Sequence, residues 1–161
     1  MRTSAIHEAG HVVVATKLGK YVTQVVLEGD EGETYADWLE NSPKFRYQKE
    51  AAILIAGMAM ERLYFRAIGQ HDLASAVTDD VSNNSDIQKL ALLVHSKGVD
   101  QTQAMANASS TLEKFYMHTL LLALMLDKSH KLTGHQVSQI MSLSGSEVAS
   151  EMAMFSASTG K

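Results

Sequence analysis

A near absence of proline is the strongest constraint on this chain, because Pro43 is the only proline in 161 residues. Proline interrupts helices, whereas alanine, leucine and methionine, which are abundant here, favour helix interiors. Only the segment YVTQVVLE at residues 21–28 is rich enough in β-branched residues to predict a strand. We therefore expect a mainly α fold of the α+β type, a helical domain with a small β-sheet element near the N-terminus.

Capping residues and glycines predict where the helices begin and end. The helix-start signals are Thr3 or Ser4, Ser42 with Pro43, Asp100 with Gln103, and Thr133 with Gln136. Gly19 and Gly98 are the expected stops of the helices that precede them. The expected helices cover residues 3–17, 43–67, 84–97, 101–127 and 134–143.

The remaining segments are rich in polar residues and glycine. Residues 29–42 predict a loop or hairpin with one further short strand, and residues 69–82 predict a polar connection. Residues 156–161 are expected to form a frayed tail. No linker, repeat or low-complexity stretch divides the chain, so residues 1–161 are expected to form a single domain.

The composition excludes several kinds of partner and site. The formal net charge is −4 and no basic cluster occurs, so we expect no nucleic-acid partner. The longest apolar run, residues 120–126, is too short for a membrane span, and the first residues turn polar too early for a secretory signal. A cytoplasmic location is therefore expected. Because cysteine is absent, a metal ion would have histidine, aspartate or glutamate as ligands.

The sequence HEAGH at residues 7–11 matches the pattern H-E-x-x-H. His7 and His11 are four residues apart, so on a helix they share one face and both imidazoles can bind the same zinc ion. Glu8 lies about 100° around the helix, where its carboxylate can accept a proton from a zinc-bound water. Gly10 has no side chain and permits close packing of a neighbouring segment behind the metal. The pattern predicts a Zn²⁺ site with Glu8 as general base.

A catalytic zinc ion needs a third protein ligand and one open position. Glu61 and Asp86 are the two main candidates, each near or on a predicted helix, and the residues alone leave both open. Asp79 and Asp80 lie in a predicted loop, where a solvated carboxylate is the simpler interpretation. Because so short a pattern also occurs by chance, a helical domain without a metal site is the alternative.

Several stretches resemble, in the same order, the peptidase domain of FtsH-type ATP-dependent zinc proteases. They are HEAGH with the following VVVA, VTQVVLEGDEGETY at 22–35, ILIAGMAMERLYF at 53–65, NNSDIQKLALLV at 83–94 and LLALMLDKSHKLTGHQVSQIM at 121–141. The resemblance implies that His7, His11 and Asp86 bind zinc. It also implies that Glu8 is the base, and that Glu61 belongs to a packing helix and is not a ligand.

The resemblance further implies a zinc metalloendopeptidase that hydrolyses peptide bonds in unfolded or flexible polypeptides with a metal-activated water. The family's ATPase module has no counterpart, since these residues contain no G-x-x-x-x-G-K-[ST] phosphate loop. Ser85 also replaces the family's asparagine before the third ligand. The alternative function is therefore a catalytically inactive, peptidase-like interaction or regulatory module. A second copy of the chain or a separate ATPase are the protein partners to consider.

A peptide substrate is expected to pair with a strand edge beside such a site, because exposed edges commonly bind peptides. The predicted strand at residues 21–28 is the expected edge, and its substrate-binding residues would be Val25, Val26 and Leu27. The acidic stretch GDEGE at residues 29–33 is either a solvated loop or part of that edge.

Overall fold

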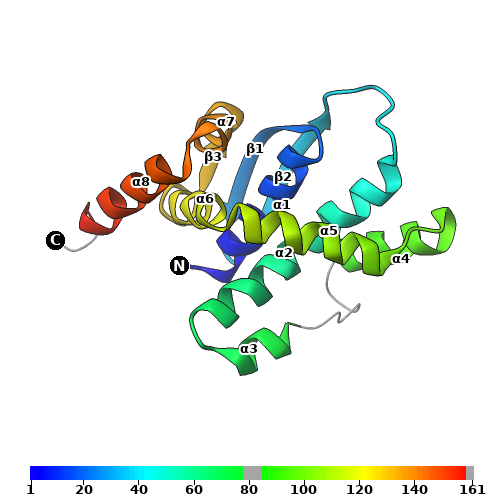
Figure 1. The fold of residues 1–161 in the computed structure, drawn as a ribbon, viewed down its shortest axis with the longest axis horizontal. Helices are drawn as coiled ribbons and strands as arrows, with labels where there is room; N and C mark the ends of the chain where they lie inside the picture. The colour runs from blue at the N-terminus through cyan, green and yellow to red at the C-terminus, as the bar shows by residue number, and fades with distance from the viewer. Residues whose placement is uncertain (78–84, 159–161) are drawn as a thin grey trace.

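The computed structural model describes residues 1–77 and 85–158, and it confirms a mainly α fold with a small sheet near the N-terminus. The elements in chain order are α1 (Thr3–Lys17), β1 (Lys20–Glu28), β2 (Glu31–Trp38), α2 (Arg46–Ala67), α3 (His71–Ala76), α4 (Ser85–Lys97), α5 (Gln101–Lys114), α6 (Tyr116–Ser129), β3 (Lys131–Thr133), α7 (Gly134–Ser142) and α8 (Gly145–Ser158). In Figure 1, α1 lies at the centre, with the sheet on one side and α2 on the other.

Helix α1 is buried along most of its length because it packs against α2, α5, α6 and the sheet. Val12, Val13 and Val14 are each at most 1% exposed, so the apolar run after the motif anchors the helix in the core. The close packing predicted at Gly10 is confirmed: a Cβ there would lie 2.6 Å from the carbonyl oxygen of Ala56 in α2. The core therefore holds the motif helix between α2 and the sheet.

The sheet is antiparallel with the strand order β2-β1-β3. The predicted strand, β1, is its central strand: it pairs with β2 along its length, and β3 pairs with it at Val25 and Val26. The N–H of Leu27 donates to the carbonyl oxygen of His130 at 2.8 Å. The prediction of a substrate-binding edge at Val25, Val26 and Leu27 is therefore wrong, because both sides of this stretch are already hydrogen-bonded. The edge strands are the short β3 and β2, the second strand of the hairpin predicted within residues 29–42.

Several helix boundaries agree with the capping signals. Helices α1 and α4 end just before Gly19 and Gly98, and both glycines adopt positive φ. Asp100 caps α5 by accepting a hydrogen bond from the Gln103 N–H at 2.9 Å. The capping box predicted at the start of α7 is present in full. These signals are correct because a cap depends only on residues within one helical turn.

Other boundaries differ from the predictions. Arg2, rather than Thr3 or Ser4, is the N-cap of α1. Helix α2 begins at Arg46, after Phe45 in the left-handed region, and Ser42 does not cap it. The connection at 69–82 contains the short helix α3, and Asn84, the expected start of α4, lies outside the described residues.

The helix predicted over residues 101–127 is two helices, α5 and α6, which are separated at Phe115. After the break, α6 packs mainly against α1, whereas α5 packs mainly against α2. At the C-terminus, the predicted fraying is wrong for residues 156–158, which belong to α8, and residues 159–161 lie outside the described part. Within the described residues, no helix combines the length and apolar character needed to cross a membrane.

Candidate metal centre

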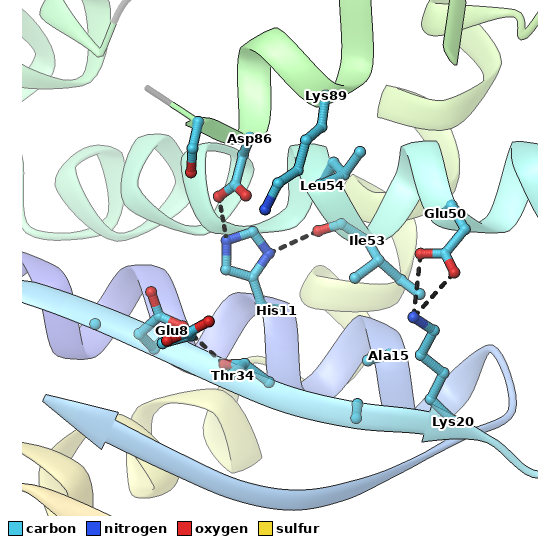
Figure 2. Close-up of a pocket in the computed structure, with 14 residues that line it drawn as sticks. Glu8, His11, Ala15, Lys20, Thr34, Glu50, Ile53, Leu54, Asp86 and Lys89 are labelled. Atoms are coloured by element: carbon cyan, nitrogen blue, oxygen red, sulfur yellow. Dashed lines mark hydrogen bonds and ion pairs between the residues drawn. The ribbon is translucent and has the colours of Figure 1, made fainter. Parts of the chain in front are cut away.

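Side chains from four elements meet at the motif (Figure 2). Helix α1 supplies both histidines and Glu8, whereas α4 supplies Asp86 from its first turn. Strand β2 passes on one side of the motif with Thr34, and α2 passes on the other with Ile53. Groups that are distant in the sequence are therefore brought to one place by the packing of α2, α4 and β2 around α1.

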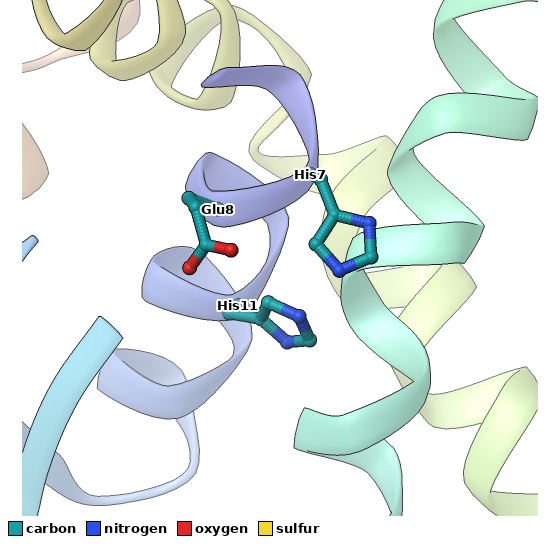
Figure 3. Close-up of side chains that lie close together, drawn as sticks. All are labelled: His7, Glu8 and His11. Atoms are coloured by element: carbon teal, nitrogen blue, oxygen red, sulfur yellow. The ribbon is translucent and has the colours of Figure 1, made fainter. Parts of the chain in front are cut away.

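Both imidazoles project from α1 toward α2, and Glu8 points to the other side of the helix (Figure 3). The ring centroids of His7 and His11 lie 4.7 Å apart. Nδ1 of His7 lies 2.5 Å from Oε1 of Glu61, and Nδ1 of His11 lies 2.7 Å from the carbonyl oxygen of Ile53. Because an N–H at Nδ1 donates to each acceptor, the Nε2 atom of each ring is the one available as a metal ligand.

Asp86 faces both of these nitrogens. Its Oδ2 lies 3.4 Å from Nε2 of His7 and 3.0 Å from Nε2 of His11. Three ligand atoms about 2.1 Å from one tetrahedral zinc ion lie about 3.4 Å from one another. The separations around Asp86 are therefore close to those of a His-His-Asp zinc site.

The Nε2 atom of His11 gives a second sign that the residues fit a metal ion. This atom is buried, and its contact with Asp86 does not have the direction of a hydrogen bond, so it has no hydrogen-bond partner among the described residues. A buried nitrogen without a partner is unfavourable. A cation bound at this point would give the nitrogen its missing partner.

Two glycines leave room for the side chains of the site. A Cβ at Gly57 in α2 would lie 2.4 Å from Nε2 of His7, and a Cβ at Gly32 in β2 would lie 2.4 Å from Cγ of Glu8. Neither glycine has positive φ, so it is the space for the neighbouring side chain, rather than an unusual backbone, that requires glycine. The surrounding elements are thus shaped to the motif on both sides.

The Glu8 carboxylate lies beside the three candidate ligands. It is 6% exposed, and its Oε2 accepts a hydrogen bond from the Thr34 hydroxyl at 2.7 Å. A carboxylate oxygen of Glu8 and one ring nitrogen from each histidine lie within 4.8 Å of one another. Because Thr34 holds Glu8 toward β2, whereas Asp86 contacts both Nε2 atoms, Asp86 is the better third ligand and Glu8 the better base.

The ionisation of the site reflects these contacts. Burial alone would lower the pKa of His7, but hydrogen bonds to Asp86 and Glu61, and their negative charge, outweigh it and raise the pKa to about 10. Burial would likewise raise the pKa of Asp86, but its close contacts with the imidazoles of His11 and His7 hold it far below its usual range. Without a metal, the site is therefore held by a charged imidazolium between two carboxylates.

The structure brings together His7, Glu8, His11 and Asp86, and it places Glu61 on the outer nitrogen of His7, away from the position of a ligand. Asp79 and Asp80 lie outside the described residues. Sequence reasoning missed the parts played by Gly32, Thr34, Ile53 and Gly57. Of these, only Gly32 had a local signal, since a glycine within a strand commonly marks a close approach.

Comparisons with known proteins do not add to this geometry. No protein-family model matches the chain, and no curated protein matches it. The interpretation of the site therefore depends on the contacts described above.

Proposed function

We propose that this chain is a zinc-dependent metalloendopeptidase of the FtsH type, which hydrolyses peptide bonds in unfolded or flexible polypeptides. One observation supports the proposal most: Nε2 of His7, Nε2 of His11 and Oδ2 of Asp86 converge, with the Glu8 carboxylate beside them. A catalytic zinc site combines three protein ligands with a nearby general base, and this arrangement supplies both.

Bound by these three residues, zinc would polarise the substrate carbonyl and make a water molecule more acidic. Glu8 would accept one proton from that water as the oxygen of the water attacks the carbonyl carbon. Glu8 would then pass the proton to the nitrogen of the leaving amine as the C–N bond breaks. The Thr34 hydroxyl, bonded to Oε2, orients the carboxylate for both transfers. Glu61 and the Ile53 carbonyl orient the two imidazoles.

The substrate would bind along β2. This strand is at the edge of the sheet, and Gly32, Thr34 and Ala36 line the cavity beside Glu8 and His11. An extended peptide added to the edge would form main-chain hydrogen bonds and bring a peptide carbonyl to the site. A folded substrate offers no free strand to pair in this way, which favours flexible polypeptides.

The test is the variant Glu8→Gln, which removes the base but none of the proposed ligands. Wild-type protein should bind about one zinc ion per chain and cleave an unfolded protein or a quenched fluorescent peptide. Glu8→Gln should keep the zinc and lose the cleavage, whereas Glu113→Gln, at an exposed position in α5, should change neither. Cleavage retained in Glu8→Gln would contradict the role of Glu8. Zinc-loaded wild-type protein that cleaves no unfolded substrate would favour the inactive interaction module.

A further inference from the structure

A cavity of about 380 Å³ extends from the metal centre between β2, α2 and the start of α4 (Figure 2). It begins at Glu8 and His11 and has an apolar wall, formed by Ala15, Ala36, Ile53 and Leu54. Its position next to the proposed base and ligand makes it the place for a substrate side chain close to the bond that is cut. Its charged residues should then decide which side chains it accepts.

Two lysines line this cavity, and their surroundings differ. Nζ of Lys20 lies 3.0 Å and 3.1 Å from the two carboxylate oxygens of Glu50, and it also lies over the ring of Trp38. Lys89 lies one helical turn after Asp86 in α4, and Figure 2 shows its amine directed toward the space above His11. Among the described residues, Lys89 has no ion-pair or hydrogen-bond partner. Lys89 is therefore the cation that remains to bind a substrate anion.

The other side of the metal centre is more acidic, although Glu8, Glu33, Glu50 and Asp86 also line the first cavity beside its two lysines. On the more acidic side, a second cavity of about 580 Å³ is lined by Asp30, Glu31 and Glu61 together with Thr3 and Ser4. None of the described residues that line it is a lysine or arginine. An anionic side chain would be repelled there, whereas Lys89 would attract it on the side of the first cavity. The charge distribution thus distinguishes the two sides of the bond that would be cut.

We propose that Lys89 is a specificity-determining residue, and that the first cavity selects an acidic substrate residue, preferably glutamate, next to the scissile bond. The proposal rests on the proposed peptidase function. The two methylene groups of glutamate would lie against the apolar wall, and its carboxylate would reach the Lys89 amine. Aspartate, which is one methylene shorter, would bury less apolar surface against the wall and would lie farther from the Lys89 amine.

The direction of β2 indicates on which side of the bond the acidic residue lies. The strand runs from Glu31, beside the second cavity, to Trp38, beyond the first. Antiparallel pairing is slightly more stable than parallel pairing. A peptide antiparallel to β2 places its N-terminal part over the first cavity, so the acidic residue precedes the scissile bond.

Three peptides that differ only in having Glu, Gln or Lys before the scissile bond test the proposal. Cleavage by the zinc-loaded full chain is measured as kcat/KM. Binding is measured on the zinc-loaded Glu8→Gln protein, because this variant should bind the peptides without cleaving them. Wild-type protein should prefer Glu to Gln about fivefold, the upper value for a solvent-accessible ion pair. Lys89→Met should abolish the preference, and Lys89→Glu should reverse it in favour of Lys. Lys97→Met, at an exposed position in the same helix, should leave it unchanged.

The outcomes separate this inference from the peptidase function. Equal cleavage of all three peptides, or a Glu preference that persists in Lys89→Met, overturns the inference and leaves the peptidase intact. A Lys89-dependent preference that appears only in a second peptide set, in which the residue after the scissile bond is varied instead, overturns the assigned position. Wild-type protein that neither binds nor cleaves any of the peptides overturns both. Circular dichroism and zinc content establish that each Lys89 variant is folded and loaded.

Discussion

Nδ1 of His7 and Oε1 of Glu61 lie 2.5 Å apart, so a carboxylate from the middle of α2 holds the first histidine of the motif. The contact directs Nε2 of the same ring toward Asp86 and His11. A carboxylate on the outer nitrogen of a ligand histidine fixes the ring orientation and increases the basicity of the other nitrogen. Glu61 is therefore a positioning residue for the proposed site, and it need not contact the metal itself.

Replacing Glu61 should weaken metal binding without removing a ligand. Glu61→Gln keeps the size of the side chain but loses its charge, so we expect zinc affinity to fall by about tenfold to 100-fold. Competition with a chromogenic zinc chelator measures the change. Glu113→Gln, an exposed glutamate in α5, is the matched control and should bind zinc as tightly as wild type. Unchanged affinity in Glu61→Gln would rule out the positioning role.

The glycine that faces His7 should be equally sensitive to substitution. Alanine in a helix is usually more stable than glycine by up to about 1 kcal/mol. In Gly57→Ala, however, the new methyl group would lie 2.4 Å from Nε2 of His7 and displace the ring. We expect zinc affinity to fall by at least about tenfold, comparable to the loss of a histidine-orienting contact.

Gly145→Ala is the control for this variant, because a Cβ at that position in α8 has no neighbour within 4 Å. It should leave zinc binding unchanged and should not lower stability. Isothermal calorimetry with zinc and thermal denaturation of both variants make the comparison. A Gly57→Ala protein that binds zinc normally would show that the ring has other positions from which to bind.

Zinc binding should release protons and become tighter as the pH rises. The pKa of His7 is raised to about 10, so the metal-free protein carries a proton on this ring at pH 7. Zinc requires the neutral ring, and the proton must leave. Below a pH of about 10 the apparent affinity should increase about tenfold per pH unit, as expected for one displaced proton. Calorimetry at pH 7 in buffers of different ionisation enthalpy should detect at least one proton released per zinc, and a value of zero would contradict the charged state of His7.

A contact at the start of α1 should make stability depend on pH in the acid range. Oδ1 of Asp127 accepts a hydrogen bond from Nε of Arg2 at 2.7 Å. Partial burial would raise the pKa of Asp127, but the hydrogen bonds from Arg2 outweigh it and lower the pKa. Because the folded pKa lies below the unfolded one, the stabilisation is present above a pH of about 4 and is lost as the pH falls further.

We therefore expect Asp127→Asn to reduce the free energy of unfolding at pH 7 by about 0.5–1 kcal/mol, as for a partly exposed ion pair. As the pH falls toward 2 the difference between the variant and wild type should shrink, because Asp127 becomes protonated. Urea denaturation at the two pH values measures this difference. Asp37→Asn, in the edge strand β2, is the control and should not reproduce it. An equal loss at both pH values would indicate a packing effect instead.

The sequence by itself determined the features that depend on neighbouring residues. The i, i+4 spacing of His7 and His11 places both rings on one face of any helix that contains them. The β-branched run at 21–28 forms a strand, and Thr133 with Gln136 caps α7, because strand preference and capping involve only a few consecutive residues. The mainly α fold follows from the same local preferences, in a chain with one proline.

Only the tertiary structure decided which distant groups meet this helix. Glu61 and Asp86 are both carboxylates on helices, and the packing of α2 and α4 against α1 places the first on Nδ1 of His7 and the second on the two Nε2 atoms. The strand order likewise leaves β2, rather than β1, at an edge of the sheet. The predicted helix is divided at Phe115 into α5, which packs mainly against α2, and α6, which packs mainly against α1. Local patterns do not contain these distances, because they arise when segments far apart in the chain bury their apolar faces against one another.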